Sequence, residues 1–237
     1  DVSSQFVTGL IFALPLLEAD SEIVLTSHLE SRPYVDITID ILRRFGITVD
    51  ETEKGFHIAG GQKYTPHDEK IEGDYSQAAF FFVANALGSQ VELENLNENS
   101  VQGDRKILEI ISEMCYNGSI GSYKADCSDI PDLVPILAVL GAYGSGESVI
   151  YNARRLKIKE SDRLESISTV LNSLGANVTI VDDELEITGV TELTGGICSS
   201  YNDHRIVMSA AIASTICKNK VIIRSCGNIF RRNQYDY

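Results

Sequence analysis

Length, composition and charge are those of an ordinary globular protein and exclude several functions. The 237 residues can bury a substantial core, with 43% apolar and 23% charged residues. The formal net charge of −14 argues against a nucleic-acid partner, because binding to phosphate backbones needs a basic surface. No apolar run reaches the roughly 18 to 20 residues that span a bilayer, so we expect no membrane partner.

The five cysteines show no paired spacing. An odd, unpatterned set is typical of reduced thiols in the cytoplasm. Four scattered histidines add no metal-ligand pattern. We therefore expect a cytoplasmic protein that binds no metal and needs no cofactor.

A polar signature opens a helix-like run of small and apolar residues four times along the chain. The signatures are Ser-Ser-Gln at 3–5, Asp-Tyr-Ser-Gln at 74–77, Asp-Ile-Pro-Asp at 129–132 and Asn-Asp-His-Arg at 202–205. The first three are followed by a short strand-like stretch, a second helix and a closing strand. Such recurrence indicates internal structural repeats.

In the first repeat, we expect a strand at residues 23–26 and a helix at residues 31–45. Ser31 can cap this helix, Pro33 suits its first turn and Gly46 suits its end. The other predicted elements are a strand pair at 47–51 and 55–59, helices at 104–114 and 161–174, and a second strand pair at 176–179 and 185–188.

These elements predict an α/β fold of repeated β-α-β-α-β-β units with a helical core. The chain opens directly on a helix and closes on a polar, tyrosine-rich tail. We therefore expect it to be truncated at both ends.

Chemistry is expected where helices begin, because their unpaired N–H groups favour phosphate and carboxylate. Ser3, Ser4 and Gln5 offer two hydroxyls and an amide to a phosphate or polyol, with simple helix capping as the alternative. Asp132 is either a first-turn charge or, in a cleft beside substrate hydroxyls, a general base. Asp129 is the nearer capping residue, which leaves Asp132 for another task.

The densest polar segment contains Arg154, Arg155, Lys157, Lys159, Glu160, Asp162 and Arg163. In an acidic protein such a basic cluster is a candidate anion site. An acid beside these cations could also deliver a proton while they hold an anion, with ordinary surface ion pairing as the alternative. At residues 202–205, Arg205 opens an apolar helix that Asp203 can cap, and His204 can simply be packed.

The order of the short motifs resembles that of the EPSP synthases. The motifs are Ser-Ser-Gln-Phe at 3–6, Ser-Arg-Pro-Tyr at 31–34, Gly-Asp at 73–74, Ile-Pro-Asp at 130–132, Lys-Glu-Ser-Asp-Arg at 159–163 and Asn-Asp-His-Arg at 202–205. Each motif alone is weak, but their order is specific. The resemblance covers nearly the whole chain and fades after about residue 227.

The resemblance implies the inside-out α/β barrel of the enolpyruvyl transferases, with two domains of three βαβαββ units each. Residues 1–71 would be the last unit of the first domain. Residues 72–237 would be most of the second domain, without its extreme ends. The missing amino-terminal portion of the same polypeptide would supply the other units.

The implied reaction transfers the enolpyruvyl group of phosphoenolpyruvate to the 5-hydroxyl of shikimate 3-phosphate and releases phosphate. The implied partners are therefore these two substrates, with glyphosate as a candidate inhibitor. The implied catalytic residues are Asp132 as the base on the 5-hydroxyl, Glu160 as the proton donor at the methylene, and Lys159. The implied contacts to shikimate 3-phosphate are Ser3, Ser4, Gln5, Ser31, Tyr34, Asp132 and Lys159. The implied contacts to phosphoenolpyruvate are Gln5, Arg163, Arg205 and Arg232.

Two positions depart from the family pattern. Arg155 stands where the family commonly has asparagine, and Arg232 stands in a stretch where the family has a lysine. Arginine can hold an anion there but cannot share a proton as lysine can. Two alternatives stay open: the sister transferase that acts on UDP-N-acetylglucosamine, and an inactive fragment that only binds ligand. By itself, the chain is expected to be incomplete and inactive.

Overall fold

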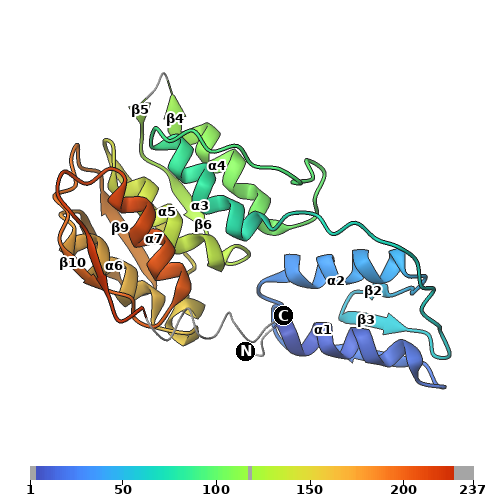
Figure 1. The fold of residues 1–237 in the computed structure, drawn as a ribbon. Coiled ribbons are helices and arrows are strands. Elements are labelled where there is room, and N and C mark those ends of the chain that lie inside the picture. Colours follow the sequence, from blue (N-terminus) through green and yellow to red (C-terminus); the bar gives the residue numbers. More distant parts are fainter. Residues whose placement is uncertain (1–3, 117–118, 227–237) are drawn as a thin grey trace. The chain divides into compact units, whose positions relative to one another are not determined.

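Two units make up the part of the chain that the computed structural model describes, residues 4–116 and 119–226 (Figure 1). Unit 1 comprises the residues up to Gly73 together with Asn95–Gly103. Unit 2 comprises Asp74–Glu94 and the residues from Asp104 onward. Each unit buries its own hydrophobic cluster.

Unit 1 combines two helices with a small antiparallel sheet. Its elements are α1 (Ser4–Ala13), η1 (Leu14–Leu16, a 3₁₀ turn), β1 (Ser21–Val24), α2 (Arg32–Arg44), β2 (Asp50–Thr52) and β3 (Gly55–Ile58). Strand β3 lies between β1 and β2. One cluster buries Ile11 of α1, Val35 and Leu42 of α2, and Phe56 of β3. In the helices, the apolar residues spaced three to four positions apart thus face the interior.

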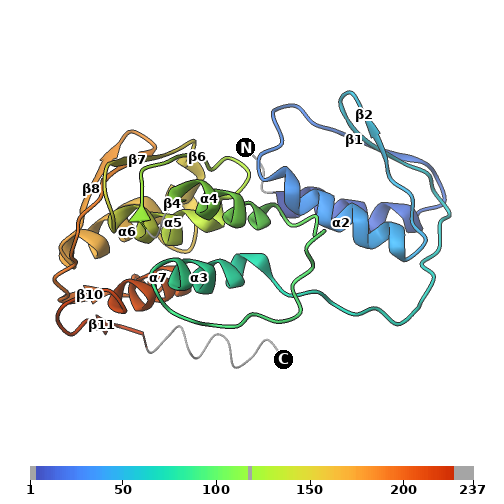
Figure 2. The same ribbon diagram turned by 90° about the horizontal axis from the view of Figure 1, so that it is seen from above.

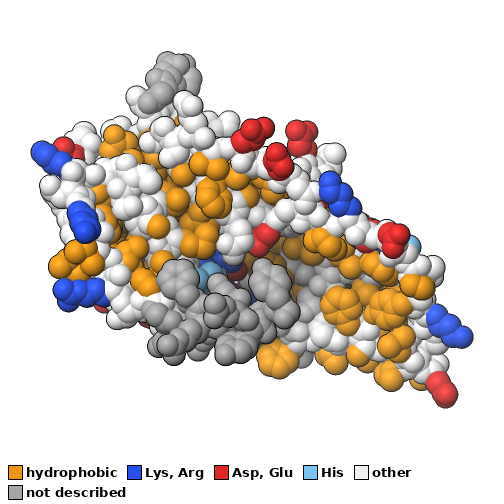
Figure 3. Space-filling model, in the orientation of Figure 1, with side chains coloured by type: hydrophobic (Ala, Val, Ile, Leu, Met, Phe, Trp, Pro, Cys, Tyr) orange, Lys and Arg blue, Asp and Glu red, His pale blue; other side chains and the backbone are white. Residues whose placement is uncertain are grey.

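Helix α1 is apolar on more than one side. Val7 and Ile11 are buried, whereas Phe6, Leu10 and Phe12 are exposed. Apolar side chains gather over this part of unit 1 in Figure 3. A contiguous exposed apolar face is typical of a surface that packs against other protein.

Unit 2 is larger and mixes helices with short strands. Its helices are α3 (Tyr75–Ala86), α4 (Ile107–Met114), α5 (Val134–Ala142), α6 (Arg163–Ser173) and α7 (His204–Ser214). Its 3₁₀ turns are η2 (Gly103–Lys106, of which the first residue belongs to unit 1), η3 (Pro131–Leu133) and η4 (Arg154–Ile158). Its strands are β4 (Cys115–Tyr116), β5 (Ser119–Ile120), β6 (Lys124–Asp126), β7 (Glu147–Tyr151), β8 (Asn177–Val181), β9 (Glu184–Thr188), β10 (Ile197–Ser199) and β11 (Ile222–Arg224).

The main sheet of unit 2 has the strand order β6-β7-β9-β8. Strands β6 and β7 pair in parallel, and the chain between them forms α5, as a parallel pair requires a crossover connection. The other two pairings are antiparallel. Helices α5 and α6 lie between this sheet and helices α3 and α7 (Figure 2).

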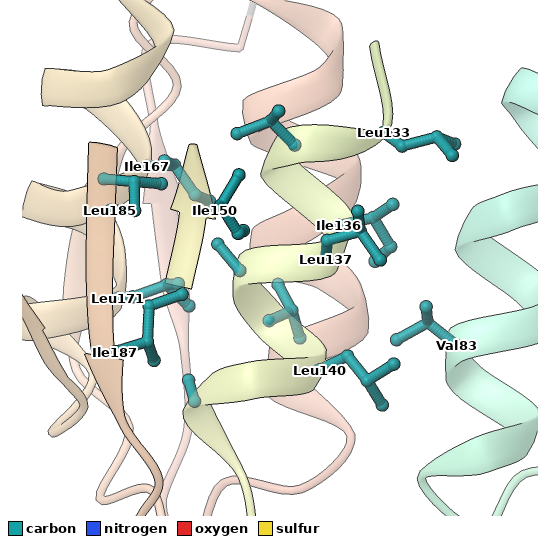
Figure 4. Packing of buried hydrophobic residues seen from close by; sticks show 14 of the residues in the cluster. Val83, Leu133, Ile136, Leu137, Leu140, Ile150, Ile167, Leu171, Leu185 and Ile187 are labelled. Carbon is teal, nitrogen blue, oxygen red and sulfur yellow. The ribbon is translucent and has the colours of Figure 1, made fainter. Parts of the chain in front are cut away.

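Helix α5 is the centre of the unit 2 core, since all nine of its residues are buried. In the close-up, its apolar side chains lie between Val83 of α3 on one side and Ile150 and Ile187 of the sheet on the other (Figure 4). A helix that is apolar all round is stable only when it is covered on every side. The predicted helical core is therefore confirmed.

Most predicted elements form near the expected residues. The helices predicted at 31–45 and 161–174 are α2 and α6, and the strand pairs predicted at 47–51 with 55–59 and at 176–179 with 185–188 form as antiparallel pairs. Pro33 lies in the first turn of α2. Gly46 follows the helix with a φ of 81°, a conformation that favours glycine.

Three local expectations are wrong. Ser31 precedes α2 with a left-handed φ of 55°, and its side chain makes no capping hydrogen bond. Asp129 does not cap the turn that carries Asp132, because Ile130 takes that position. No strand forms between α3 and η2. There the side-chain amide of Asn85 donates to the carbonyl of Val91 and accepts from its N–H, at 2.8 Å each. The helix predicted at 104–114 also begins as the 3₁₀ turn η2.

Candidate active site

Five of the residues singled out in the sequence meet at one place in unit 2. Asp132 lies in η3, just before α5. Lys159 and Glu160 follow η4, Arg163 is the first residue of α6, and Arg205 is the second residue of α7. Helices α5, α6 and α7 contact one another, which brings these chain segments together.

Asp132 is surrounded by cations. Its Oδ1 accepts a hydrogen bond from Nη1 of Arg163 at 2.8 Å and lies 3.5 Å from Nζ of Lys159. Its Oδ2 accepts from Nη2 of Arg205 at 3.1 Å, and Nη1 of Arg205 lies 3.3 Å from the backbone carbonyl oxygen of Asp132. The Asp132 side chain is 18% exposed, so this ionised group still reaches solvent.

Arg163 is enclosed, with 1% of its side chain exposed. Its Nε donates to Oδ2 of Asp203 at 2.8 Å, and its Nη2 donates to Oε2 of Glu160 at 2.5 Å. With the bond to Asp132, all three nitrogens of the guanidinium face carboxylates. Such planar, charge-assisted bonds fix the orientation of an arginine.

Electrostatics keep these groups ionised. Burial raises the pKa of Asp132, but Arg205, Lys159 and Arg163 together outweigh burial and lower the pKa below its ordinary value. Burial also raises the pKa of Asp203, and the hydrogen bond from Arg163 reverses that effect, so this pKa is lowered too.

The histidine beside these groups behaves differently. Burial lowers the pKa of His204, and the neighbouring Arg205 lowers it further, which favours a neutral imidazole.

Helix capping places the two arginines, because each cap sets the residue at which its helix begins. Asp162 caps α6 by accepting from the N–H of Glu165 at 3.2 Å, which sets Arg163 in the first turn. Asp203 caps α7 by accepting from the N–H of Arg205 at 2.9 Å, as predicted. Each arginine therefore lies beside the positive end of its own helix, which adds to the attraction for an anion.

The predicted basic cluster does not form one patch. Arg163 is buried, and Nζ of Lys157 donates to the backbone carbonyl of Asp182 at 2.8 Å. Arg154 is exposed. Lys159 and Arg163 both reach Asp132.

Unit 1 carries four of the other candidates. Ser4 is buried in α1, and Gln5 beside it is exposed. Ser31 is buried, and its backbone carbonyl accepts from the N–H of Tyr34 at 3.1 Å, so both lie in one turn at the start of α2. Ser3 and Arg232 lie outside the described residues.

None of the short motifs indicated the second role of Asp203. It was expected only to cap α7, yet it also binds Arg163, and Ser161 donates to it at 3.0 Å. What requires this partner is the burial of Arg163, because buried charges are paired, and no short motif expresses that burial. His204, which could simply have been packed, keeps 37% of its side chain exposed.

Neither a metal site nor a membrane span is found in the described parts of the chain. Within residues 4–116 and 119–226, no three potential ligand side chains gather in a way that could hold a metal ion. None of the helices there has the length and apolar character needed to cross a bilayer.

Comparison with known proteins gives a consistent result. Residues 1–231 match the sequence profile of the family described as EPSP synthase (3-phosphoshikimate 1-carboxyvinyltransferase). A 3-phosphoshikimate 1-carboxyvinyltransferase of Clostridium perfringens is 46% identical over 238 residues, covering 94% of this chain and 56% of the relative. The enzyme of that name from Methanocaldococcus jannaschii is 43% identical, with 94% and 55% covered. The chain thus spans about half the length of the curated relatives it matches.

A solved structure supports the fold. The EPSP synthase from Acinetobacter baumannii superposes with a TM-score of 0.80 over 98% of this chain and 57% of that one, at 22% sequence identity. This likeness confirms the predicted α/β fold of the enolpyruvyl transferases. The motifs, the profile match and the relatives agree, and the chain belongs to the EPSP synthase family.

Proposed function

We propose that the complete protein, of which this chain is a part, transfers the enolpyruvyl group of phosphoenolpyruvate to the 5-hydroxyl of shikimate 3-phosphate. Phosphate is the second product. The observation that carries the proposal is the carboxylate of Asp132, held ionised by Arg163, Arg205 and Lys159 and still open to solvent. A reaction between an alcohol and an anion that carries both a phosphate and a carboxylate needs a base and several cations side by side.

The chemistry assigns one task to each group. Asp132 accepts the proton of the 5-hydroxyl while the hydroxyl oxygen bonds to C2 of phosphoenolpyruvate. Glu160, which is 43% exposed, acts in its protonated form: it gives a proton to the methylene carbon and forms a methyl group. In the second step Glu160 takes back a proton from that methyl and the C–O bond to phosphate breaks. Asp132 returns the hydroxyl proton to the leaving phosphate. Arg163 and Arg205 hold the phosphate and carboxylate throughout.

The remaining contacts complete the proposed substrate sites. Lys159 reaches shikimate 3-phosphate, together with Ser3, Ser4, Gln5, Ser31 and Tyr34 of the preceding domain. Gln5 and Arg232 add contacts to phosphoenolpyruvate. The proposal assigns residues 1–71 to the last unit of one domain and residues 72–237 to the other. It also includes a cytoplasmic location and inhibition by glyphosate.

Phosphate release from phosphoenolpyruvate tests the function directly. The protein would carry its native upstream residues, and release would be measured with shikimate 3-phosphate, with UDP-N-acetylglucosamine and with neither. We expect release only with shikimate 3-phosphate, and glyphosate should slow it. Release that depends on UDP-N-acetylglucosamine would replace the proposal with the sister activity, and silence with both would refute transfer.

Asp132→Asn tests the base. The substitution keeps the shape of the side chain and removes the proton acceptor, so kcat should fall about 10²- to 10⁴-fold. Asp129→Asn is the matched control, because Asp129 is exposed three residues earlier in the same segment. Equal activity of the two variants would remove Asp132 from the mechanism.

A further inference from the structure

Asp203 is closed to solvent and bonded through both carboxylate oxygens. Its exposed fraction is 0%. Oδ2 accepts from Nε of Arg163 at 2.8 Å and from Oγ of Ser161 at 3.0 Å, while Oδ1 accepts from the backbone N–H of Arg205 at 2.9 Å. Because nothing of this side chain reaches the surface, any effect on a ligand must pass through its partners.

The bond to Nε decides which edge of Arg163 faces outward. A guanidinium is a rigid planar fork, so holding Nε fixes the directions of Nη1 and Nη2. These two nitrogens point to Asp132 and Glu160, whose side chains are 18% and 43% exposed. The Nε edge faces a fully buried acid. Because Arg163 itself is 1% exposed, an incoming anion can reach it only from the Nη1 and Nη2 edge, by displacing the partly exposed carboxylates of Asp132 and Glu160.

Capping alone does not explain Asp203. Asp162 caps the neighbouring helix α6 with the same kind of bond and remains exposed. The chain also approaches Asp203 through two successive left-handed residues, Tyr201 at φ 52° and Asn202 at φ 55°. Residues with a side chain adopt this conformation at a cost, so the surroundings must impose it. Oγ of Ser200, also fully buried, accepts from the N–H of Asn202 at 3.1 Å and donates to the carbonyl of Ser225 at 2.7 Å.

We propose that Asp203 is a positioning residue, which holds Arg163 by Nε so that its two terminal nitrogens form the binding edge for the anionic substrate. The inference rests on the proposed function and deepens it, since the anion would be phosphoenolpyruvate. Asp203 itself touches no substrate. It sets the direction of the Arg163 side chain. By capping α7, it also fixes the position of Arg205 in the first turn of that helix.

Steady-state kinetics of the complete protein test this role with two matched variants, Asp203→Asn and Asp162→Asn. Asparagine can still cap a helix, so both helices keep their first turn, and only the charge beside Nε is lost at position 203. We expect Asp203→Asn to raise the KM for phosphoenolpyruvate roughly 10- to 100-fold, the usual effect of one charge-assisted hydrogen bond. The KM for shikimate 3-phosphate should stay unchanged, and Asp162→Asn should alter neither value.

A structural role would look different. A parallel rise in both KM values, or equal effects of the two variants, would overturn the inference. If Asp203→Asn does not fold by circular dichroism, Ser161→Ala replaces it, because it removes one donor from the same Oδ2. We expect a smaller rise in the KM for phosphoenolpyruvate, roughly 2- to 10-fold, and no rise would refute the role.

A failure of the proposed function can be distinguished from a failure of the inference about Asp203. If the wild-type protein releases no phosphate with shikimate 3-phosphate, the transfer reaction is refuted and turnover is no longer the readout. Calorimetric titration of wild type and Asp203→Asn with phosphoenolpyruvate then tests the inference by affinity alone. Weaker binding to the variant supports it, and equal binding, or no binding to wild type, overturns it.

Discussion

Replacing Arg163 by methionine should destabilise unit 2 strongly. The arginine side chain is 1% exposed and contacts three carboxylates, of which Asp203 has no contact with water. Methionine fills similar space but leaves Asp203 as a buried charge without its counter-ion. Breaking a buried ion pair from one side costs about 3–5 kcal/mol, and solvent screening does not reduce this figure at so buried a site.

Thermal unfolding of the complete protein, followed by circular dichroism, measures this loss. For a unit of this size, about 3–5 kcal/mol lowers the unfolding midpoint by roughly 6 to 20 °C. Arg154→Met is the control, because Arg154 is an exposed arginine in the turn η4 just before this site, and its effect should lie within about 0.5 kcal/mol.

A double substitution tests the cause. Asp203→Asn combined with Arg163→Met removes both charges and retains a capping side chain, so most of the lost stability should return. If the double variant is less stable than Arg163→Met, or if Arg163→Met behaves like the control, the reasoning from a buried counter-ion is refuted.

Three further predictions concern acid stability, thiol reactivity and backbone space. The pKa values of Asp132 and Asp203 are lowered in the folded protein. The stability that these two carboxylates contribute is therefore present above the unfolded pKa of about 3.9 and is lost as pH falls through the lowered values. The urea midpoint should drop steeply below about pH 4. Burial raises the pKa of Cys127 to about 12, so this thiol should resist alkylation at pH 8 until the protein is unfolded. Gly55→Ala should destabilise unit 1 by at least about 1–3 kcal/mol, because the new Cβ would lie 2.0 Å from the carbonyl oxygen of Ile23.

Each of the three has its own contrary result. Asp203→Asn should show a shallower loss of stability in acid, and an unchanged slope would exclude this carboxylate as a cause. Alkylation of native Cys127, located by peptide mapping, would contradict its burial. Gly9→Ala is the control for Gly55, since a Cβ there meets nothing within 4 Å and alanine favours a helix; equal losses would contradict the steric argument.

The sequence predicted those elements whose signal is local. The helix α6 shows regular apolar spacing and a closing glycine, and Leu164, Ile167 and Leu171 are buried as that spacing requires. The prediction that Ser31 caps α2 was wrong because a serine cap is only one way to begin a helix. Here the helix begins with Pro33 in its first turn, after a left-handed backbone at Ser31. The strand expected after α3 failed because a strand depends on a neighbour, which periodicity within one segment cannot reveal.

The candidate site was predicted as a set of motifs, whereas its connections were not. Asp132 and Arg205 are 73 positions apart, and only the packing of α5 against α7 joins them. The pairing of Arg163 with Asp203 spans 40 positions and depends on burial that no short motif expresses. Residue types and order therefore indicated the chemistry, and the fold decided which acid holds which arginine.

The complete burial of α5 has a consequence for how the site moves. Asp132 lies immediately before the most enclosed helix of unit 2, so its backbone should open only when the whole unit unfolds. Lys159 and Glu160 follow a 3₁₀ turn in which Lys157 and Ile158 are exposed, and such a segment opens at much lower cost. One wall of the site is thus stationary and the other can adjust. In hydrogen exchange, amides of residues 134–142 should remain protected with or without ligand, while protection gained on binding should appear around residues 157–162.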